Sequence, residues 1–190
     1  MSTEKSVAQD NVSAGLITNP VAGDMVGAGG VYTVECVGPD GQVKWTESAH
    51  NLVVNQGLAN MNGAYLAGTA QTVTWYIGLV TGPGSGTTFA AGDTLASHAG
   101  WTENTAYSGN RKAVTFVSAT TANPSVISNS ASPVSFAMTG TATIAGAFLC
   151  SVDTGTSGIL FSESDFTGGD KSVASGDTLN VTYTFSLTAT

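Results

Sequence analysis

The chain has 190 residues, of which 42% are hydrophobic and only 9% are charged, and its formal net charge is -8. This length suits one domain or two small ones, and the hydrophobic share excludes a wholly disordered protein. Lys and Arg number 5 against 13 Asp and Glu, so the basic surface that binds phosphate groups is missing. We therefore expect no nucleic acid partner.

Residues 1–29 are small, polar and rich in glycine, and they show no sustained period of 2 or 3.6. We expect an extended N-terminal arm, either flexible or ordered only on a neighbouring subunit. Its first residues lack a basic region followed by an apolar run, and no stretch of about 20 apolar residues occurs in the chain. A secretory signal and a membrane partner are therefore not expected.

The segment 31–46 predicts a β-hairpin. Two strand-like runs flank Gly38–Gly41, where Pro39 presets a turn and Gly41 supplies a positive φ.

The hydrophobic pattern changes from strand spacing to helical spacing after the hairpin. One short helix is predicted over about 55–67, because apolar residues recur there at helical spacing: Leu58, Met61, Tyr65 and Leu66.

The ends of this helix also have sequence signals. Asn55 is a possible N-cap, and Gly68 suits the C-terminal end. The segment 71–80 then alternates as a strand, with Val73, Trp75, Ile77 and Leu79 on one face.

The remaining chain is rich in strand and turn signals. The segment 89–109, with aromatic anchors Trp101 and Tyr107, should wrap the surface of a sheet. Gly146 indicates a bulge or a close backbone approach within its strand. Further strands are predicted at 112–117, 134–138, 141–150, 158–161 and 177–190.

These elements predict an all-β fold. About eight or nine strands at this spacing are typical of an antiparallel sandwich or jelly roll, with one helix and one extended arm. We expect a single β-rich domain over 30–190. The segments 91–95 and 175–179 share the sequence Gly-Asp-Thr-Leu, so the same turn is predicted twice.

Residues able to bind metals are few and scattered. Cys36 and Cys150 lie in apolar strand-like stretches, so we expect buried free thiols rather than a disulfide. The close paired spacing of a zinc module is missing. The loop 163–170 offers three carboxylates to a calcium ion, but it does not match the helix-loop-helix calcium pattern, and a solvated turn is expected.

Catalytic signatures are also missing. No serine lies in a Gly-x-Ser-x-Gly context, and His98, close to Trp101 and Glu103, is expected to pin a loop through hydrogen bonds. We assign no catalytic, cofactor or metal residues. Trp75 and Trp101, with Tyr76 and Tyr107, either stack on a glycan or serve as core and interface anchors.

A set of short segments, in this order, resembles a family of little-characterised virion proteins of tailed bacteriophages and prophages. The resemblance covers roughly residues 30–190. Its segments are 34–45 (Val-Glu-Cys-Val-Gly-Pro-Asp-Gly-Gln-Val-Lys-Trp), 51–53 (Asn-Leu-Val), 75–79 (Trp-Tyr-Ile-Gly-Leu), 91–94 with 97–103 (Ala-Gly-Asp-Thr and Ser-His-Ala-Gly-Trp-Thr-Glu), and 168–171 with 176–183 (Gly-Gly-Asp-Lys and Gly-Asp-Thr-Leu-Asn-Val-Thr-Tyr).

The resemblance implies a non-enzymatic virion component assembled in the bacterial host cytoplasm. Within it, the low charge favours a capsid decoration or cement protein that binds the major capsid protein or other virion proteins, as a homo-oligomer, trimer first and dimer next. The alternatives are a glycan-binding host-recognition protein of a tail or head fibre and, behind it, a polysaccharide-degrading enzyme. The predicted interface residues are Met25, Val26, Trp75, Pro83, Phe89, His98, Trp101 and Tyr107.

Overall fold

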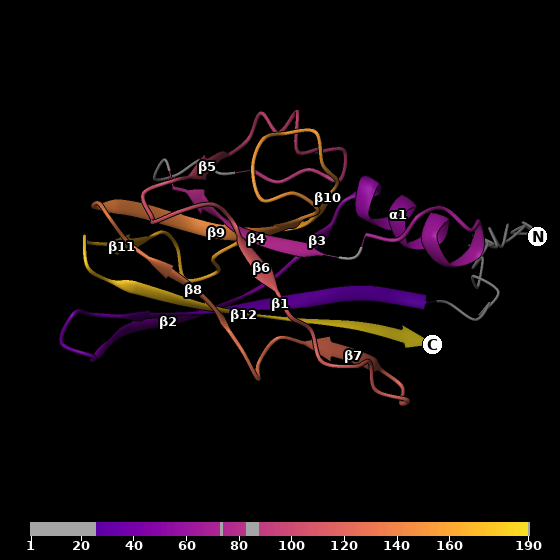
Figure 1. The fold of residues 1–190 in the computed structure, drawn as a ribbon, viewed down its shortest axis with the longest axis horizontal. Coiled ribbons are helices and arrows are strands. Elements are labelled where there is room, and N and C mark those ends of the chain that lie inside the picture. The colour runs from indigo at the N-terminus through magenta and orange to yellow at the C-terminus, as the bar shows by residue number, and fades with distance from the viewer. Residues whose placement is uncertain (1–25, 73, 83–87, 190) are drawn as a thin grey trace, which may run out of the picture.

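The computed structural model describes residues 26–72, 74–82 and 88–189, which form two antiparallel sheets packed face to face (Figure 1). This arrangement confirms the predicted all-β sandwich with one helix. Met25 and Pro83, and the rest of the predicted arm up to residue 25, lie outside the described residues.

The first sheet is built on a long ladder between β1 and β12, which pair from Val26 with Ala189 to Val37 with Thr178. β2 pairs with the other edge of β1, and β7 and β8 both pair with β12. The strands are β1 (Val26–Val37), β2 (Val43–His50), β7 (Ser125–Ser128), β8 (Val134–Ala137) and β12 (Thr178–Ala189).

The second sheet has the order β3-β10-β9-β4-β5, with β11 also paired to β9 and β6 to β4. Its central strands are β9 and β4, and its shortest strands carried no strong alternation in the sequence. The strands are β3 (Leu52–Val53), β4 (Trp75–Thr81), β5 (Thr102–Asn104), β6 (Lys112–Val114), β9 (Ala142–Cys150), β10 (Leu160–Asp165) and β11 (Lys171–Val173).

The predicted hairpin is confirmed, but its first strand is longer than expected. The turn closes with a 2.9 Å bond from the Gly41 N–H to the Gly38 carbonyl. β1 begins at Val26, so placing residues 26–29 in the arm was wrong. Glycines at 27, 29 and 30 have no side chains to show an alternating pattern, yet their backbones pair with β12. Gly30 also leaves room for the Tyr183 ring.

The helix α1 (Asn55–Leu66) confirms the helix prediction and corrects one of its ends. Its N-cap is Val54, without a side-chain hydrogen bond, so the predicted Asn55 cap is wrong. Gly68 follows the C-cap with a φ of 70°, as expected. A Cβ on Gly57 would overlap the Phe161 carbonyl, so the glycine lets α1 lie close against β10. In the described ranges no helix is long and apolar enough to cross a membrane.

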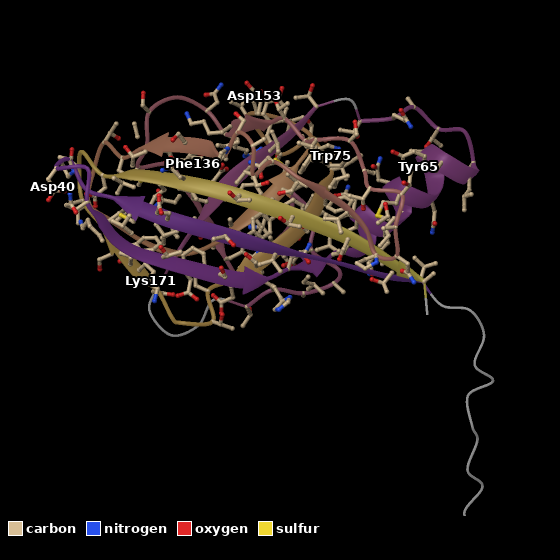
Figure 2. All side chains as sticks on the ribbon, turned by 90° about the horizontal axis from the view of Figure 1, so that it is seen from below. Asp40, Tyr65, Trp75, Phe136, Asp153 and Lys171 are labelled. Atoms are coloured by element: carbon tan, nitrogen blue, oxygen red, sulfur yellow. The ribbon has the colours of Figure 1, made fainter. Side chains whose placement is uncertain are left out.

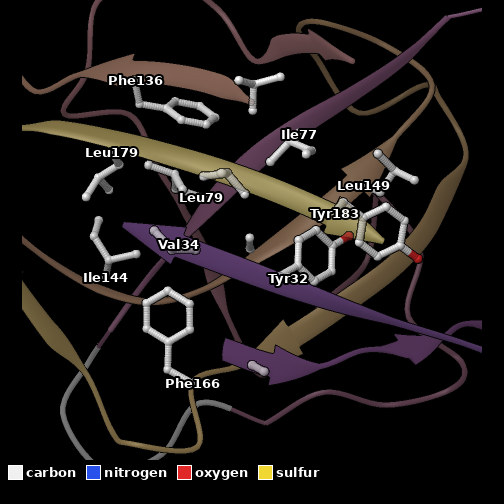
Figure 3. Close-up of a cluster of buried hydrophobic side chains, with 14 of the residues drawn as sticks. Tyr32, Val34, Ile77, Leu79, Phe136, Ile144, Leu149, Phe166, Leu179 and Tyr183 are labelled. Atoms are coloured by element: carbon white, nitrogen blue, oxygen red, sulfur yellow. The ribbon is translucent and has the colours of Figure 1, made fainter. Parts of the chain in front are cut away.

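The main core lies between the sheets (Figure 3). The alternation of the last strand predicted its buried face, and Leu179, Val181 and Tyr183 are indeed fully buried. Tyr183 stacks on Tyr32 with ring centroids 4.4 Å apart. Both hydroxyls reach the buried Ser162 hydroxyl, at 2.9 Å from Tyr32 and 3.3 Å from Tyr183, so the polar tips are satisfied inside the core.

A second cluster covers the outer face of the second sheet. Residues 88–101, here called the covering loop, place Leu95 and Trp101 on apolar side chains of that face, including Phe148 and Leu160. This confirms that the segment wraps a sheet. β9 is therefore buried on both faces, which explains its nearly continuous apolar run.

The irregularity predicted at Gly146 is also present. The pairing of β4 with β9 shifts register between Val80 and Thr81, opposite Gly146 and Ile144. A Cβ on Gly146 would overlap the Ser164 carbonyl of β10. The glycine is therefore required by a close approach of two backbones.

Candidate functional site

An apolar pocket of about 240 Å³ lies at the end of the sandwich beside α1. Its wall comes from α1, from both sheets and from the segment after β6, and it contains no charged side chain. The uncharged polar residues of the lining, apart from the aromatic ones, are Asn60, Gln71, Thr72 and Ser125. The aromatic wall residues are Tyr65, Trp75, Phe116, Phe161, Tyr183 and Phe185.

Contacts among these rings hold the wall in place. The Trp75 ring meets Phe161 edge to face at 5.2 Å between centroids, and Phe161 meets Phe185 at 5.4 Å. Phe116 meets Tyr183 at 6.3 Å. Such pairs fix ring orientation as well as burying area. The pocket is therefore a preformed apolar recess, of the kind that receives apolar side chains or a small ligand.

The outer side of α1 continues the apolar surface beyond the pocket. Tyr65 is 76% exposed, Leu66 is 85% exposed and Leu58 is 41% exposed. Leu58 and Tyr65 lie two turns apart on one helix face. Gly57 is the buried residue of this helix. The helical spacing in the sequence therefore marked a face that the described residues leave exposed, and sequence reasoning missed it as a surface site.

The opposite end of the molecule offers a contrast. Figure 2 shows Asp40, in the turn between β1 and β2, at one end and Tyr65 at the other. Val43, at the start of β2, is 54% exposed there. It is accompanied by charged neighbours such as Lys44, which pairs with Asp177 at 2.7 Å. The uncharged aromatic pocket lies at the α1 end.

Trp101 and Tyr107, predicted as interface residues, are core residues instead. Trp101 is 5% exposed and packs on Phe148 at 5.0 Å, and Tyr107 is 7% exposed and packs on Phe136 at 4.7 Å. The Trp101 ring lies between Phe148 of β9 and the Phe89 and His98 rings of its own loop, and the Tyr107 ring lies against Phe136 of β8. As surface contacts both predictions are wrong, and Trp101 is also too buried to stack on a glycan.

His98 and Phe89 belong to the same covering loop. The His98 ring stacks on Trp101 at 3.8 Å, and its Nδ1 lies 3.1 Å from the Trp101 carbonyl oxygen. Phe89 lies 6.0 Å from Trp101 between ring centroids. These contacts hold the loop around Trp101, which packs on Phe148 of β9, so His98 helps to pin the loop as expected from the sequence.

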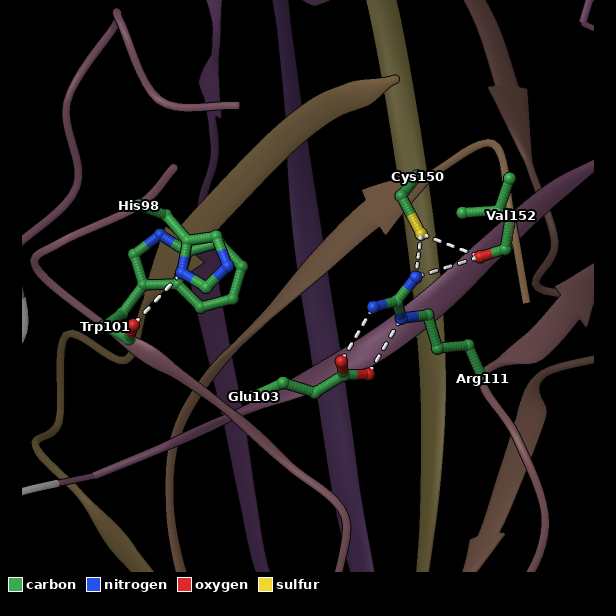
Figure 4. A network of polar contacts seen from close by, with 6 residues as sticks. All are labelled: His98, Trp101, Glu103, Arg111, Cys150 and Val152. Atoms are coloured by element: carbon green, nitrogen blue, oxygen red, sulfur yellow. Dashed lines mark hydrogen bonds and ion pairs between the residues drawn. The ribbon is translucent and has the colours of Figure 1, made fainter. Parts of the chain in front are cut away.

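Glu103 takes part in a separate ion-pair network (Figure 4). Arg111 donates to both Glu103 carboxylate oxygens, at 2.8 Å and 2.7 Å. Its remaining nitrogen donates to the Val152 carbonyl at 3.2 Å and lies 3.7 Å from the Cys150 sulfur. The guanidinium thereby ties the segment before β6 to the chain after β9, which is a structural role.

Glu163 is the most unusual acid in the described part of the chain. It is fully buried under the covering loop, and its Oε2 accepts a 2.9 Å hydrogen bond from Trp101 Nε1. The carboxyl lies near Asp93 and the Ala90 N–H, but no group among the described residues reaches its buried Oε1 with hydrogen-bond geometry. Burial, reinforced by the nearby Asp93, raises the pKa of Glu163 to about 8.

Glu163 does not join the other carboxylates of 163–170 in a calcium site. It points toward Trp101, whereas Asp165 interacts with Asp170. Among the described residues, no three His, Cys, Asp or Glu side chains are grouped to hold a metal ion. Cys36 and Cys150 are free and buried, and burial raises both thiol pKa values, to about 11 for Cys36.

Two further predicted interface residues remain near the surface. Trp75 is half-buried in the pocket wall, and Val26 is 71% exposed at the start of β1. The sequence analysis singled out Val26 and Trp75. It could not find the pocket, because strands and a helix that are far apart in the chain form its wall. Comparisons with protein-family models, curated proteins and solved structures found no match for this chain.

Proposed function

We propose that this chain is a non-enzymatic structural protein of a bacteriophage virion, a decoration or cement protein that binds the assembled head. The observation that carries the proposal is the apolar face of α1 that the described residues leave exposed, with Leu58, Tyr65 and Leu66 beside an uncharged pocket. Exposed apolar surface of this kind marks sites of protein association. Head binding would stabilise the shell by mass action, because the protein binds the assembled lattice and not free coat subunits.

The arrangement of acids supports a structural rather than a catalytic role. Glu103 is held by Arg111, Glu47 by Lys171 at 3.0 Å, and Asp177 by Lys44. Each of these carboxylates is committed to a cross-strand or loop contact. The pocket wall offers none to a substrate.

The first test is the copy number of this chain in purified particles, measured against the major coat protein by quantitative mass spectrometry. A ratio near one per coat subunit, or a simple fraction of it, supports decoration of the lattice. A few copies per particle would place the protein on the tail or collar instead, and complete absence would contradict a virion role.

The second test removes the apolar face of α1. Leu58→Ser with Leu66→Ser should weaken binding to heads from which this protein has been removed by about tenfold or more. The reason is that each apolar side chain buried on binding contributes about 1.5–3 kcal/mol. Val43→Ser is the matched control, since Val43 is also exposed but begins β2 directly after the Asp40 turn, which lies at the opposite end from Tyr65 (Figure 2). Equal losses in both proteins would contradict α1 as the contact surface.

Glycan binding is the second candidate, favoured by one observation. Trp75 is half-buried in the pocket wall together with the exposed ring of Tyr65. Aromatic faces with a few polar neighbours such as Gln71 can stack on a sugar ring. Titration with host surface glycans, followed by Trp fluorescence in wild type and in Trp75→Phe, tests this function, and an unchanged signal in the wild type contradicts it.

A further inference from the structure

We propose that the apolar segment Ala14–Ile17 of the N-terminal region occupies the aromatic pocket beside α1 in its own chain. The inference does not depend on a virion role, because it concerns the isolated protein. It names the occupant of a preformed recess that the described residues leave open.

The position of β1 brings the preceding chain to the pocket. Val26 pairs with Ala189, and Ala28 pairs with Leu187, a pocket residue of β12. The start of β1, the end of β12 and α1 lie at the same end of the sandwich (Figure 1). The 25 residues that precede Val26 therefore join the domain next to the pocket.

The length of this segment is sufficient. Nine peptide steps separate Ile17 from Val26, and an extended chain covers about 3.3–3.6 Å per residue, or roughly 30 Å. Pro20 and Gly23 lie between them, and these residue types favour the chain reversal that a return to the pocket requires.

The chemistry of the segment matches the wall. Residues 11–23 contain no charged side chain, and neither does the pocket lining. Leu16 and Ile17 are adjacent large aliphatic residues, suited to a recess of about 240 Å³ lined with aromatic rings. Asn60 and Ser125 in the wall can hydrogen-bond the backbone of an entering segment.

Covalent attachment favours the segment over a free ligand. A short tether holds its binding group at an effective concentration of the order of millimolar. Even if the apolar contact is weak, the segment would then occupy the pocket in a large fraction of molecules. A partner would have to displace the segment before it could enter the pocket.

Cysteine cross-linking tests this arrangement in the full chain. Ile17→Cys with Gln71→Cys, at the pocket wall, should form a disulfide within one chain about tenfold faster than Val7→Cys with Gln71→Cys. The native thiols are buried and do not compete. Equal rates, or disulfides formed only between chains on a non-reducing gel, would overturn the proposal.

A dye measurement provides an independent readout. Leu16→Asp with Ile17→Asp should increase the fluorescence of anilinonaphthalene sulfonate several-fold, because the emptied aromatic pocket accepts the dye. Val7→Asp with Val12→Asp is the matched control and should resemble the wild type. Circular dichroism establishes that each variant is folded, and equal dye fluorescence in all three folded proteins would overturn the proposal.

Discussion

The two Gly-Asp-Thr-Leu turns, one ending at Leu95 and the other at Leu179, share their hydrogen-bond pattern. In each, the aspartate carboxylate accepts a bond from the N–H three residues earlier, at 3.2 Å for Asp93 and 2.8 Å for Asp177. The reciprocal bonds from the aspartate N–H are 2.8 Å and 3.1 Å. Both leucines are buried. The repeat seen in the sequence therefore forms the same hydrogen bonds twice, although the backbones differ at the glycine: Gly176 has a φ of 90°, whereas Gly92 has no positive φ.

The surroundings of the two aspartates differ in charge. Asp177 accepts a 2.7 Å bond from Lys44, and this contact lowers the Asp177 pKa. Asp93 lies beside the buried Glu163, whose pKa is raised to about 8. The local sequence thus specifies the hydrogen bonds of the turn, whereas residues from other strands decide whether its carboxylate faces a cation or a second acid.

The largest expected effect comes from the turn with the cation. Asp177→Asn should lower the free energy of unfolding at pH 7 by about 2 kcal/mol, because the neutral amide forms no ion pair with Lys44 and accepts the Ala174 N–H bond more weakly. The pKa of Asp177 is lower in the folded protein than in the unfolded chain, where it is about 3.9. The carboxylate therefore stabilises the fold above this pH, and the stabilisation is lost as pH falls through the folded pKa. Urea unfolding at pH 7 and at about pH 2–3 measures both effects.

Lys44→Gln serves as the companion variant. Removing the Lys44 ammonium leaves the buried Asp177 carboxylate without its cation, so this variant should also be less stable than the wild type at pH 7, and its Asp177 pKa should be higher. If Asp177→Asn is as stable as the wild type at pH 7, the two turns do not differ in the way proposed.

Much of the fold could be predicted from local patterns. Period-2 alternation marked β12, and Pro39 with Gly41 marked the hairpin. Val26–Gly30 was missed because its glycines carry no side chains to alternate. The burial of Glu163 could not be predicted, because it depends on a loop about 70 residues earlier in the chain. The pocket likewise joins elements far apart in sequence.

The second effect comes from the turn with the neighbouring acid. The pKa of Glu163 is raised to about 8 in the folded protein, whereas in the unfolded chain it is about 4.3. Protonation of Glu163 therefore stabilises the fold fully below about pH 4.3, and this stabilisation is lost as pH rises through about 8. Glu163→Gln mimics the protonated acid and can still accept the Trp101 bond. It should raise the free energy of unfolding at pH 8.5 by about 1–2 kcal/mol and change it little at pH 4.

Glu35→Gln controls for the loss of one negative charge, since Glu35 lies partly exposed on β1. Urea unfolding from pH 4 to pH 8.5 should show falling stability in the wild type and in this control, and a flatter profile in Glu163→Gln. If stability falls with pH equally in all three proteins, Glu163 does not titrate as proposed, and the two turns do not differ in this way.

The smallest effect tests the covering loop that sets the first turn apart. His98→Ala removes a ring stacked at 3.8 Å on Trp101 and should lower the free energy of unfolding by about 0.5–1 kcal/mol. Because Trp101 donates to Glu163, Trp fluorescence should follow the titration of this acid in the wild type. Loosening the loop admits water to Glu163, so the midpoint should move below pH 8 in His98→Ala, whereas His98→Phe, which keeps a stacked ring, should move it less. An unchanged midpoint in His98→Ala would show that burial of Glu163 does not depend on this contact.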